Sequence, residues 1–251
     1  MQYVKTGKCI WCGRTIPDVS FHTIPHIIPG SLGGHETGFD VCDECNHYFG
    51  TSQQRRPSPD VVFKEIFNVT RLIREDLDEN THKKLKSIFF QYRHSRNVFI
   101  IKSSFNERII TTQFKRGLYE VFLQMYHKKT GDGNNPKFAA VRDFARYNKG
   151  ELKVFYAFNN VVLAPDFNAD PDLVISDKLI DDMNRTGVFL FWFLSHPLYL
   201  EVFPTLFNVY GSEYLQDEAN SMLLNVKGNE CIFELQNIMQ MDFFMQRFNS
   251  Q

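Results

Sequence analysis

The sequence predicts an α+β protein in which a small cysteine-stapled module precedes a larger domain of mixed helices and β-sheet. All four paired cysteines fall within residues 1–50, a stretch rich in glycine and proline. Apolar residues then recur mainly at helical spacing up to about residue 147, and β-branched and aromatic runs dominate after it. We therefore expect a module at 1–50, a linker at 51–59 and an α+β domain at 60–251.

Length and composition allow a sizeable core and argue against a disordered chain. The 251 residues are 43% hydrophobic and include 25 phenylalanines. The formal net charge is −1, yet residues 1–130 hold 19 Lys and Arg against 13 Asp and Glu, and residues 131–251 hold 9 against 16. A basic front half could face a polyanion, although ordinary solvated faces can produce the same distribution.

No segment predicts export or a membrane span. A charged and then apolar leader is missing, and the longest apolar run, at residues 187–194, is far below the roughly 18 residues that a span requires. We therefore expect a cytoplasmic protein with no membrane association. In that reducing compartment, paired cysteines are more often metal ligands than disulfides.

Local periodicity predicts the individual elements. Helices are expected at residues 60–92, 115–129, 136–148 and 238–248. Strands are expected at 97–104 and 107–114, as a hairpin, and at 151–158, 159–164, 187–194, 198–203, 221–226 and 230–235. The lone Cys231 falls in the last strand, where we expect it to be a small buried hydrophobe.

Two C-x-x-C pairs predict a structural metal site. They are Cys9-Ile-Trp-Cys12, followed by a glycine, and Cys42-Asp-Glu-Cys45. Two thiolate pairs on tight turns can close a tetrahedral four-cysteine zinc site, and a module with little core of its own gains stability from such a metal. A chance occurrence or a redox pair is the alternative. Because the two pairs use four of the five cysteines, we favour structural Zn²⁺.

Between the two pairs, His26 stands in the phrase PHIIPGSLGG. Together with CIWCG and VCDECNHYFG, this stretch of about fifty residues resembles the HNH endonucleases of the ββα-metal type with a four-cysteine zinc clamp. The resemblance implies that His26 is the general base that activates water for phosphodiester hydrolysis. The unperturbed pKa of a histidine suits that task. The alternative is a histidine merely hydrogen-bonded within a small core.

The cation ligands that the resemblance implies are only partly present. The residue before the base is commonly Asp or Glu in the family, and here it is Pro25. Asn46, directly after the last cysteine, matches a family ligand, and His47 could replace it by a shift of one residue. Asp40 could orient His26 or supply the missing carboxylate. Further candidates are Glu36 and Thr37 for orienting the base, and His22 and His35 as substitute ligands. The expected catalytic cation is Mg²⁺ or Mn²⁺.

The resemblance thus implies a metal-dependent endonuclease that hydrolyses DNA in restriction, antiviral defence or a mobile element, with a target-selecting α+β domain. Two alternatives stay open: a decayed zinc-stapled module that binds nucleic acid or a partner, which Pro25 favours, and a nuclease acting on RNA. One site per chain would favour a homodimer or a partner subunit for cutting both strands. Basic residues after the module could contact phosphates, unless they form only a solvated face. They are Arg55, Arg56, Lys83, Lys84 and Lys86.

Overall fold

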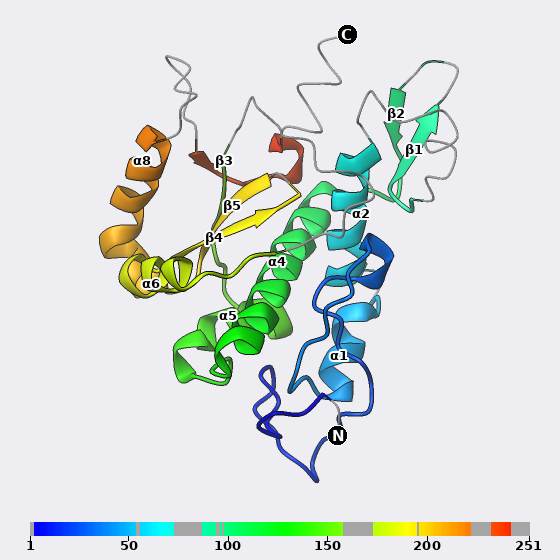
Figure 1. Ribbon diagram of the computed structural model, residues 1–251. Helices are drawn as coiled ribbons and strands as arrows, with labels where there is room; N and C mark the ends of the chain where they lie inside the picture. The colour runs from blue at the N-terminus through cyan, green and yellow to red at the C-terminus, as the bar shows by residue number, and fades with distance from the viewer. Residues whose placement is uncertain are drawn as a thin grey trace.

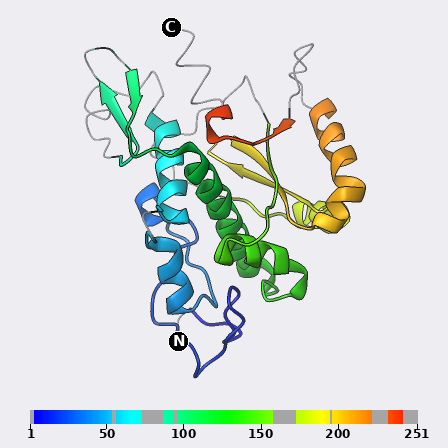
Figure 2. The ribbon, with the colours of Figure 1, turned by 180° about the vertical axis from the view of Figure 1, so that it is seen from behind.

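The computed structural model describes residues 3–53, 56–72, 87–93, 96, 98–157, 173–194, 196–221 and 232–241. Figure 1 shows one long helix, α4, with the amino-terminal module and α2 on one side and a sheet with flanking helices on the other. The view from behind in Figure 2 shows the same order of layers. The predicted α+β class is confirmed.

The structure has the following helices and strands. The α-helices are α1 (Asp43–Gly50), α2 (Pro59–Leu72), α4 (Glu107–Thr130), α5 (Ala139–Tyr147), α6 (Asp177–Thr186), α7 (Pro204–Leu206) and α8 (Ser212–Ser221). The strands are β1 (Phe90–Arg93), β2 (Val98–Ile101), β3 (Val154–Ala157), β4 (Val188–Phe193), β5 (His196–Glu201) and β6 (Ile232–Glu234). Short 3₁₀ turns are η1 (Gly30–Leu32), η3 (Pro136–Phe138) and η5 (Ile238–Gln240), and η4 (Phe207–Gly211) is a π turn.

Helix α4 is the scaffold of the molecule, because it is buried nearly all round from Ile110 to His127. The Asn106 side chain caps it by accepting a hydrogen bond from the N–H of Ile109, and Gly131 ends it in a left-handed conformation at φ 76°. Residues 107–114 are therefore helical, and the predicted strand there is wrong. The cap and the continued helical spacing after it outweigh the β-branched composition of that stretch.

Aromatic contacts join α4 to its two neighbours. Phe63 of α2 lies with its ring centroid 6.5 Å from that of Phe114, and Phe122 lies 4.8 Å from Phe189 of β4. Gly117 allows the close approach of α2, since a Cβ there would stand only 3.0 Å from the Cβ of Phe63. Helix α4 therefore packs between α2 and the sheet.

The sheet is antiparallel, in the order β4-β5-β3-β6. In β4, Phe189, Phe191 and Phe193 are buried while Trp192 is 49% exposed, which is the alternation expected of a strand with one covered face. β1 pairs with β2 in a separate hairpin, so residues 90–92 are strand and the predicted helix does not reach them. None of the helices within the described ranges is long and apolar enough to cross a membrane.

Some expected elements lie outside the described residues: the strands at 159–164 and most of 221–226, Cys231, and the end of the helix predicted to close the chain. Helices α6, α7 and α8 follow residue 147, in a stretch expected to be mainly β. One hydrophobic cluster includes residues from Cys9 to Met241. The module and the rest therefore pack as one unit, and a folding boundary at 51–59 stays a prediction.

Candidate active site

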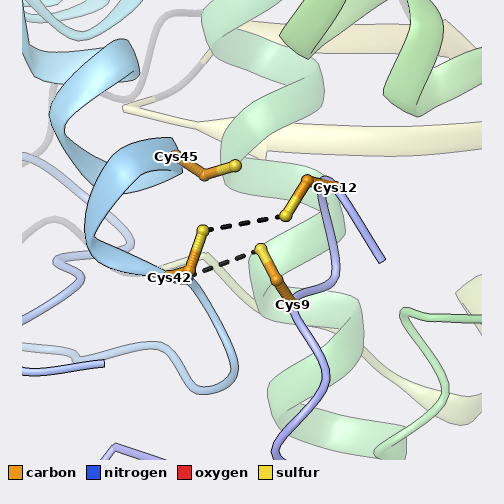
Figure 3. A group of neighbouring side chains, drawn as sticks. All are labelled: Cys9, Cys12, Cys42 and Cys45. Atoms are coloured by element: carbon orange, nitrogen blue, oxygen red, sulfur yellow. Dashed lines mark hydrogen bonds between the residues drawn. The ribbon is translucent and has the colours of Figure 1, made fainter. Parts of the chain in front are cut away.

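The four paired cysteines converge on one point, as Figure 3 shows. Their Sγ atoms all lie within 4.8 Å of one another, and those of Cys12 and Cys42 are 3.8 Å apart. A tetrahedral zinc site with Zn–S bonds of about 2.3 Å has sulfur atoms about 3.8 Å apart. Cys9 and Cys12 come from the amino-terminal loop, Cys42 caps α1, and Cys45 follows in the first turn of that helix.

One backbone N–H group and two arginine side chains donate hydrogen bonds to the sulfur atoms of the cluster. The N–H of Cys42 donates to Cys9 Sγ at 3.4 Å, Arg14 Nε donates to Cys12 Sγ at 3.4 Å, and Arg146 Nε of α5 donates to Cys45 Sγ at 3.4 Å. Two guanidinium groups beside the thiolates offset part of the negative charge that a four-cysteine zinc site carries. Arg146 also ties the cluster to the second half of the chain.

The thiols compete for protons when no cation is bound. The hydrogen bond with Cys12 raises the pKa of Cys9, and the bond with Cys42 raises the pKa of Cys45 to about 12. The pKa of Cys12 shifts in the other direction, because its hydrogen bond with Cys9 lowers it to about 6. A divalent cation stabilises all four thiolates together, so the donor set and its spacing fit zinc.

His26 is exposed at the centre of a short antiparallel pairing with Thr37. The N–H of Ile27 donates to the carbonyl of Glu36 at 3.1 Å, and the N–H of Gly38 donates to the carbonyl of Pro25 at 2.7 Å. Pro25 and Ile27 are buried on either side of His26, as alternation requires. His26 is therefore not a core histidine, and its ring faces solvent.

The first turn of α1 holds the segment that leads into His26. Asn46 Nδ2 donates to Thr23 Oγ1 at 3.0 Å and to the carbonyl of Ile24 at 3.2 Å. The Asp43 carboxylate accepts the N–H groups of His22 and Thr23 at 2.8 and 2.7 Å. Asn46 Oδ1 has no hydrogen-bond partner among the described residues. The structure thus brings Asn46 to the strand of His26 and leaves one amide oxygen available.

Asp43 is a site residue that the sequence reasoning missed. Although burial opposes ionisation, hydrogen bonds from Ser20, Thr23 and His22 hold its pKa well below the ordinary range. A partial signal was available, because an acidic residue in the first turn of a helix is favoured there and is often held in a fixed position. His47, by contrast, is exposed with Nδ1 3.3 Å from Thr51 Oγ1, one turn further along the helix.

Asp40 has a different place from the one predicted. It is fully buried, and its oxygens accept from the N–H groups of Lys5, Thr6 and Gly7 at 2.8–3.1 Å and lie 2.9 Å from Nε2 of His127. These contacts hold the pKa of Asp40 below its ordinary value despite its burial. Because both carboxylate oxygens are hydrogen-bonded in the interior, Asp40 stabilises the module and is not available to bind a cation at an exposed site.

A row of buried polar residues on α4, the α4 polar stripe, faces the module. Its members recur every three or four residues: Gln113, Arg116, Glu120, Gln124 and His127. Gln113 Nε2 donates to the carbonyl of Pro57, Arg116 donates to the Tyr48 hydroxyl at 2.6 Å, and His127 contacts Asp40. The sequence analysis predicted a helix at 115–129 without identifying this row, although the spacing of its polar residues indicates a second partner face.

Two acids meet at the middle of this stripe. Burial raises the pKa of Asp60, in the first turn of α2, to about 6, and burial next to Asp60 raises the pKa of Glu120 further. Gln124 Nε2 donates to Glu120 at 3.3 Å, but Glu120 Oε2 and Gln124 Oε1 have no donor within the described ranges. The contact between α2 and α4 therefore contains a carboxyl pair that favours sharing a proton.

Of the predicted phosphate-binding residues, the structure describes one. Arg56 is exposed, with its backbone paired to Gln53 next to the start of α2. Arg55, Lys83, Lys84 and Lys86 lie outside the described residues.

Comparison with known proteins assigns the module. Residues 9–58 match the family model of HNH endonucleases. No curated protein and no solved structure shows a significant match to the chain. The match covers both cysteine pairs, His26 and Asn46, and it stops where α2 begins. The chain therefore carries an HNH endonuclease domain at residues 9–58, with a four-cysteine cluster suited to zinc.

Proposed function

We propose that this chain is a metal-dependent HNH endonuclease that hydrolyses phosphodiester bonds in DNA. His26 acts as the general base that takes a proton from water, and Asn46 is the first ligand of the catalytic cation. Four cysteines hold structural zinc, and a role in restriction, antiviral defence or a mobile element is part of the same proposal.

One observation carries the proposal: His26 is exposed on a rigid support next to the first turn of α1. The backbone pairing with Thr37 holds it from one side, and the bonds from Asn46 to Thr23 and Ile24 hold the preceding segment. A general base needs a fixed position and access to water, and His26 has both. A histidine with a structural role alone would be expected to have a buried ring.

The nature of the donors favours Mn²⁺ over Mg²⁺. Asp40 and Asp43 are engaged in the frame, and Pro25 offers no ligand atom. The donors that remain in the module are the amide oxygen of Asn46 and exposed histidine rings, among them that of His47. Imidazole suits transition metals better than Mg²⁺, which prefers oxygen ligands. When bound, such a cation would neutralise charge on the scissile phosphate.

The same facts support a second candidate, a zinc-stapled module that binds nucleic acid or a protein partner without cutting. Pro25 is buried where the family commonly has a carboxylate, and the nearby carboxylates of Glu36, Asp40 and Asp43 contact Lys128, His127 and the N–H of Thr23 respectively. Such a module would keep its zinc and its affinity for nucleic acid while lacking cation-dependent cleavage.

A plasmid-nicking assay with Mn²⁺, Mg²⁺ or EDTA separates the two candidates. We expect cleavage in Mn²⁺ and a loss of about 10²–10⁴-fold in His26→Ala, because that is the usual contribution of a general base. Asp18→Ala, at an exposed position of the same module, is the control. Zinc content is measured in every protein, so that loss of fold is not read as loss of chemistry.

Three outcomes are informative. Cation-dependent cleavage that His26→Ala abolishes, with zinc retained, supports the nuclease and its base. Cleavage of single-stranded RNA but not of plasmid would move the proposal to RNA. Retained zinc with no cleavage of DNA or RNA in either cation would reject the nuclease and favour the binding module.

A further inference from the structure

A pocket of about 370 Å³ lies outside the HNH domain, on the side of α4 opposite to the α4 polar stripe. Arg108, Thr112 and Lys115 line it along the first turns of α4, and Phe144 and Asn148 at the end of α5 form another wall. The volume is within the range of small-molecule sites, about 300–1,000 Å³. The pocket is therefore large enough for a metabolite and is unrelated to the candidate active site.

Lys115 is the unusual residue of this pocket. It is only 5% exposed, and within the described part of the chain its amine has no hydrogen bond and no ion pair. Burial lowers the pKa of Lys115, and Glu151 and Glu234 oppose that effect only through space. The stem of Lys115 is buried, but its Nζ is not among the fully enclosed polar atoms of the described residues, so the amine reaches the pocket. An anion in the pocket would give this amine a direct partner.

The rest of the pocket offers polar groups that are not engaged elsewhere. The side chains of Asn148 and Gln236 have no hydrogen bonds to other described residues, and both line the pocket at exposed positions. Phe144, which is 4% exposed, supplies an apolar wall. Such a mixture of one buried charge, a few amides and an aromatic ring is typical of sites that orient a small polar ligand.

Two acids limit the charge of that ligand. Glu107 also lines the pocket, although the Asn237 amide binds its carboxylate, and Glu151 lies exposed at the pocket. With Lys115 and Arg108 on the other side, the pocket is balanced in formal charge. The pocket therefore has no net positive charge to attract a polyanion such as a nucleic-acid strand, whereas Lys115 can pair with a single anionic group.

We propose that this pocket binds a small organic anion, with a single phosphate or carboxylate group placed against Lys115 and a polar body bound by Asn148 and Gln236. This site does not depend on nuclease activity. It would allow a metabolite to bind on the scaffold helix that also holds the HNH domain.

Titration calorimetry on the zinc-loaded protein tests the proposal with inorganic phosphate, adenosine monophosphate and lactate, and with adenosine as the uncharged probe. We expect at least one charged probe to bind with a Kd on the order of 1 mM or below, and adenosine alone not to bind. Lys115→Met should weaken binding about tenfold or more. Lys178→Met, an exposed lysine on α6, is the matched control and should bind as the wild type does.

Folding of the variants is verified by thermal unfolding and zinc content. Methionine fills a similar volume without a charge, so Lys115→Met should keep the fold. Asn148→Gly is a second variant, because the residue sits at φ 53°, which glycine adopts readily, and it too should weaken binding. Binding of the phosphate probes or of lactate identifies the anionic group. Failure of all charged probes to bind, or equal binding by Lys115→Met, would overturn the proposal.

Discussion

Replacing Asp40 with glycine tests whether this carboxylate organises both halves of the zinc cluster. Its oxygens accept from the N–H groups of Lys5, Thr6 and Gly7 at 2.8–3.1 Å and lie 2.9 Å from Nε2 of His127. The backbone of Asp40 has φ 55°, which glycine adopts without strain. The variant therefore reports on the lost side chain alone, apart from a small entropic cost.

The expected loss can be worked from these contacts. The three backbone bonds lie at partly exposed positions, so each contributes about 1 kcal/mol. The ring N–H of His127 is fully buried and would lose its acceptor, at a cost of about 2 kcal/mol. The total, about 5 kcal/mol, is a large part of the usual stability of about 5–15 kcal/mol. Because Asp40 lies two residues before Cys42, we also expect faster release of zinc.

Urea unfolding followed by circular dichroism measures the loss, and a chromophoric chelator measures zinc release. Asp18→Gly, at an exposed position of the same module, is the matched control and should change stability by about 0.5 kcal/mol or less. In a double-mutant cycle with His127→Ala, the two losses should not add, because the two residues share one bond. A loss below about 1 kcal/mol for Asp40→Gly would refute the reasoning.

Three further predictions concern the cluster and its acids. Arg146→Ala should weaken zinc binding about 10–100-fold in competition with a chelator, because the guanidinium supports Cys45 Sγ. Burial raises the pKa of Asp60 to about 6, from about 3.9 in the unfolded chain, so the wild type loses stability as pH rises between these values. Asp60→Asn should therefore be about 3 kcal/mol more stable than the wild type at pH 7 and equal to it near pH 4. Equal stabilities at pH 7 would contradict this. The pKa of Asp43 is lowered, so its contribution to stability is present above about pH 4 and is lost on further acidification. In urea unfolding measured between pH 2 and 5, Asp43→Asn should therefore lose less stability on acidification than the wild type.

The local motifs predicted what depends on short-range geometry. The spacing of Cys9 with Cys12 and of Cys42 with Cys45 brings each pair together within one turn, so the cluster needed only one long-range contact to form. For His26 the sequence left two possibilities open, an exposed base or a histidine within a small core, and the structure showed the exposed position, with Pro25 and Ile27 buried on either side. The α+β class and helices such as α2 and α5 were visible in the spacing of apolar residues.

In one segment, the local sequence pattern predicted the wrong secondary structure. Residues 107–114 resembled a strand because they are β-branched, but the Asn106 cap and burial against α2 made them the first turns of α4. Composition alone does not decide between helix and strand where tertiary packing buries most of the segment, as it does here from Ile110 onward.

By itself, the sequence determined the four-cysteine cluster suited to zinc, the base candidate His26 and the missing carboxylate at Pro25, since each rests on residues close together in the chain. Only the tertiary structure decided the role of Asp40, whose partner His127 is 87 residues away. The α4 polar stripe and the pocket at Lys115 were decided in the same way. Whether a buried polar group has a hydrogen-bond partner depends on which segments pack around it, and these segments are far apart in the sequence.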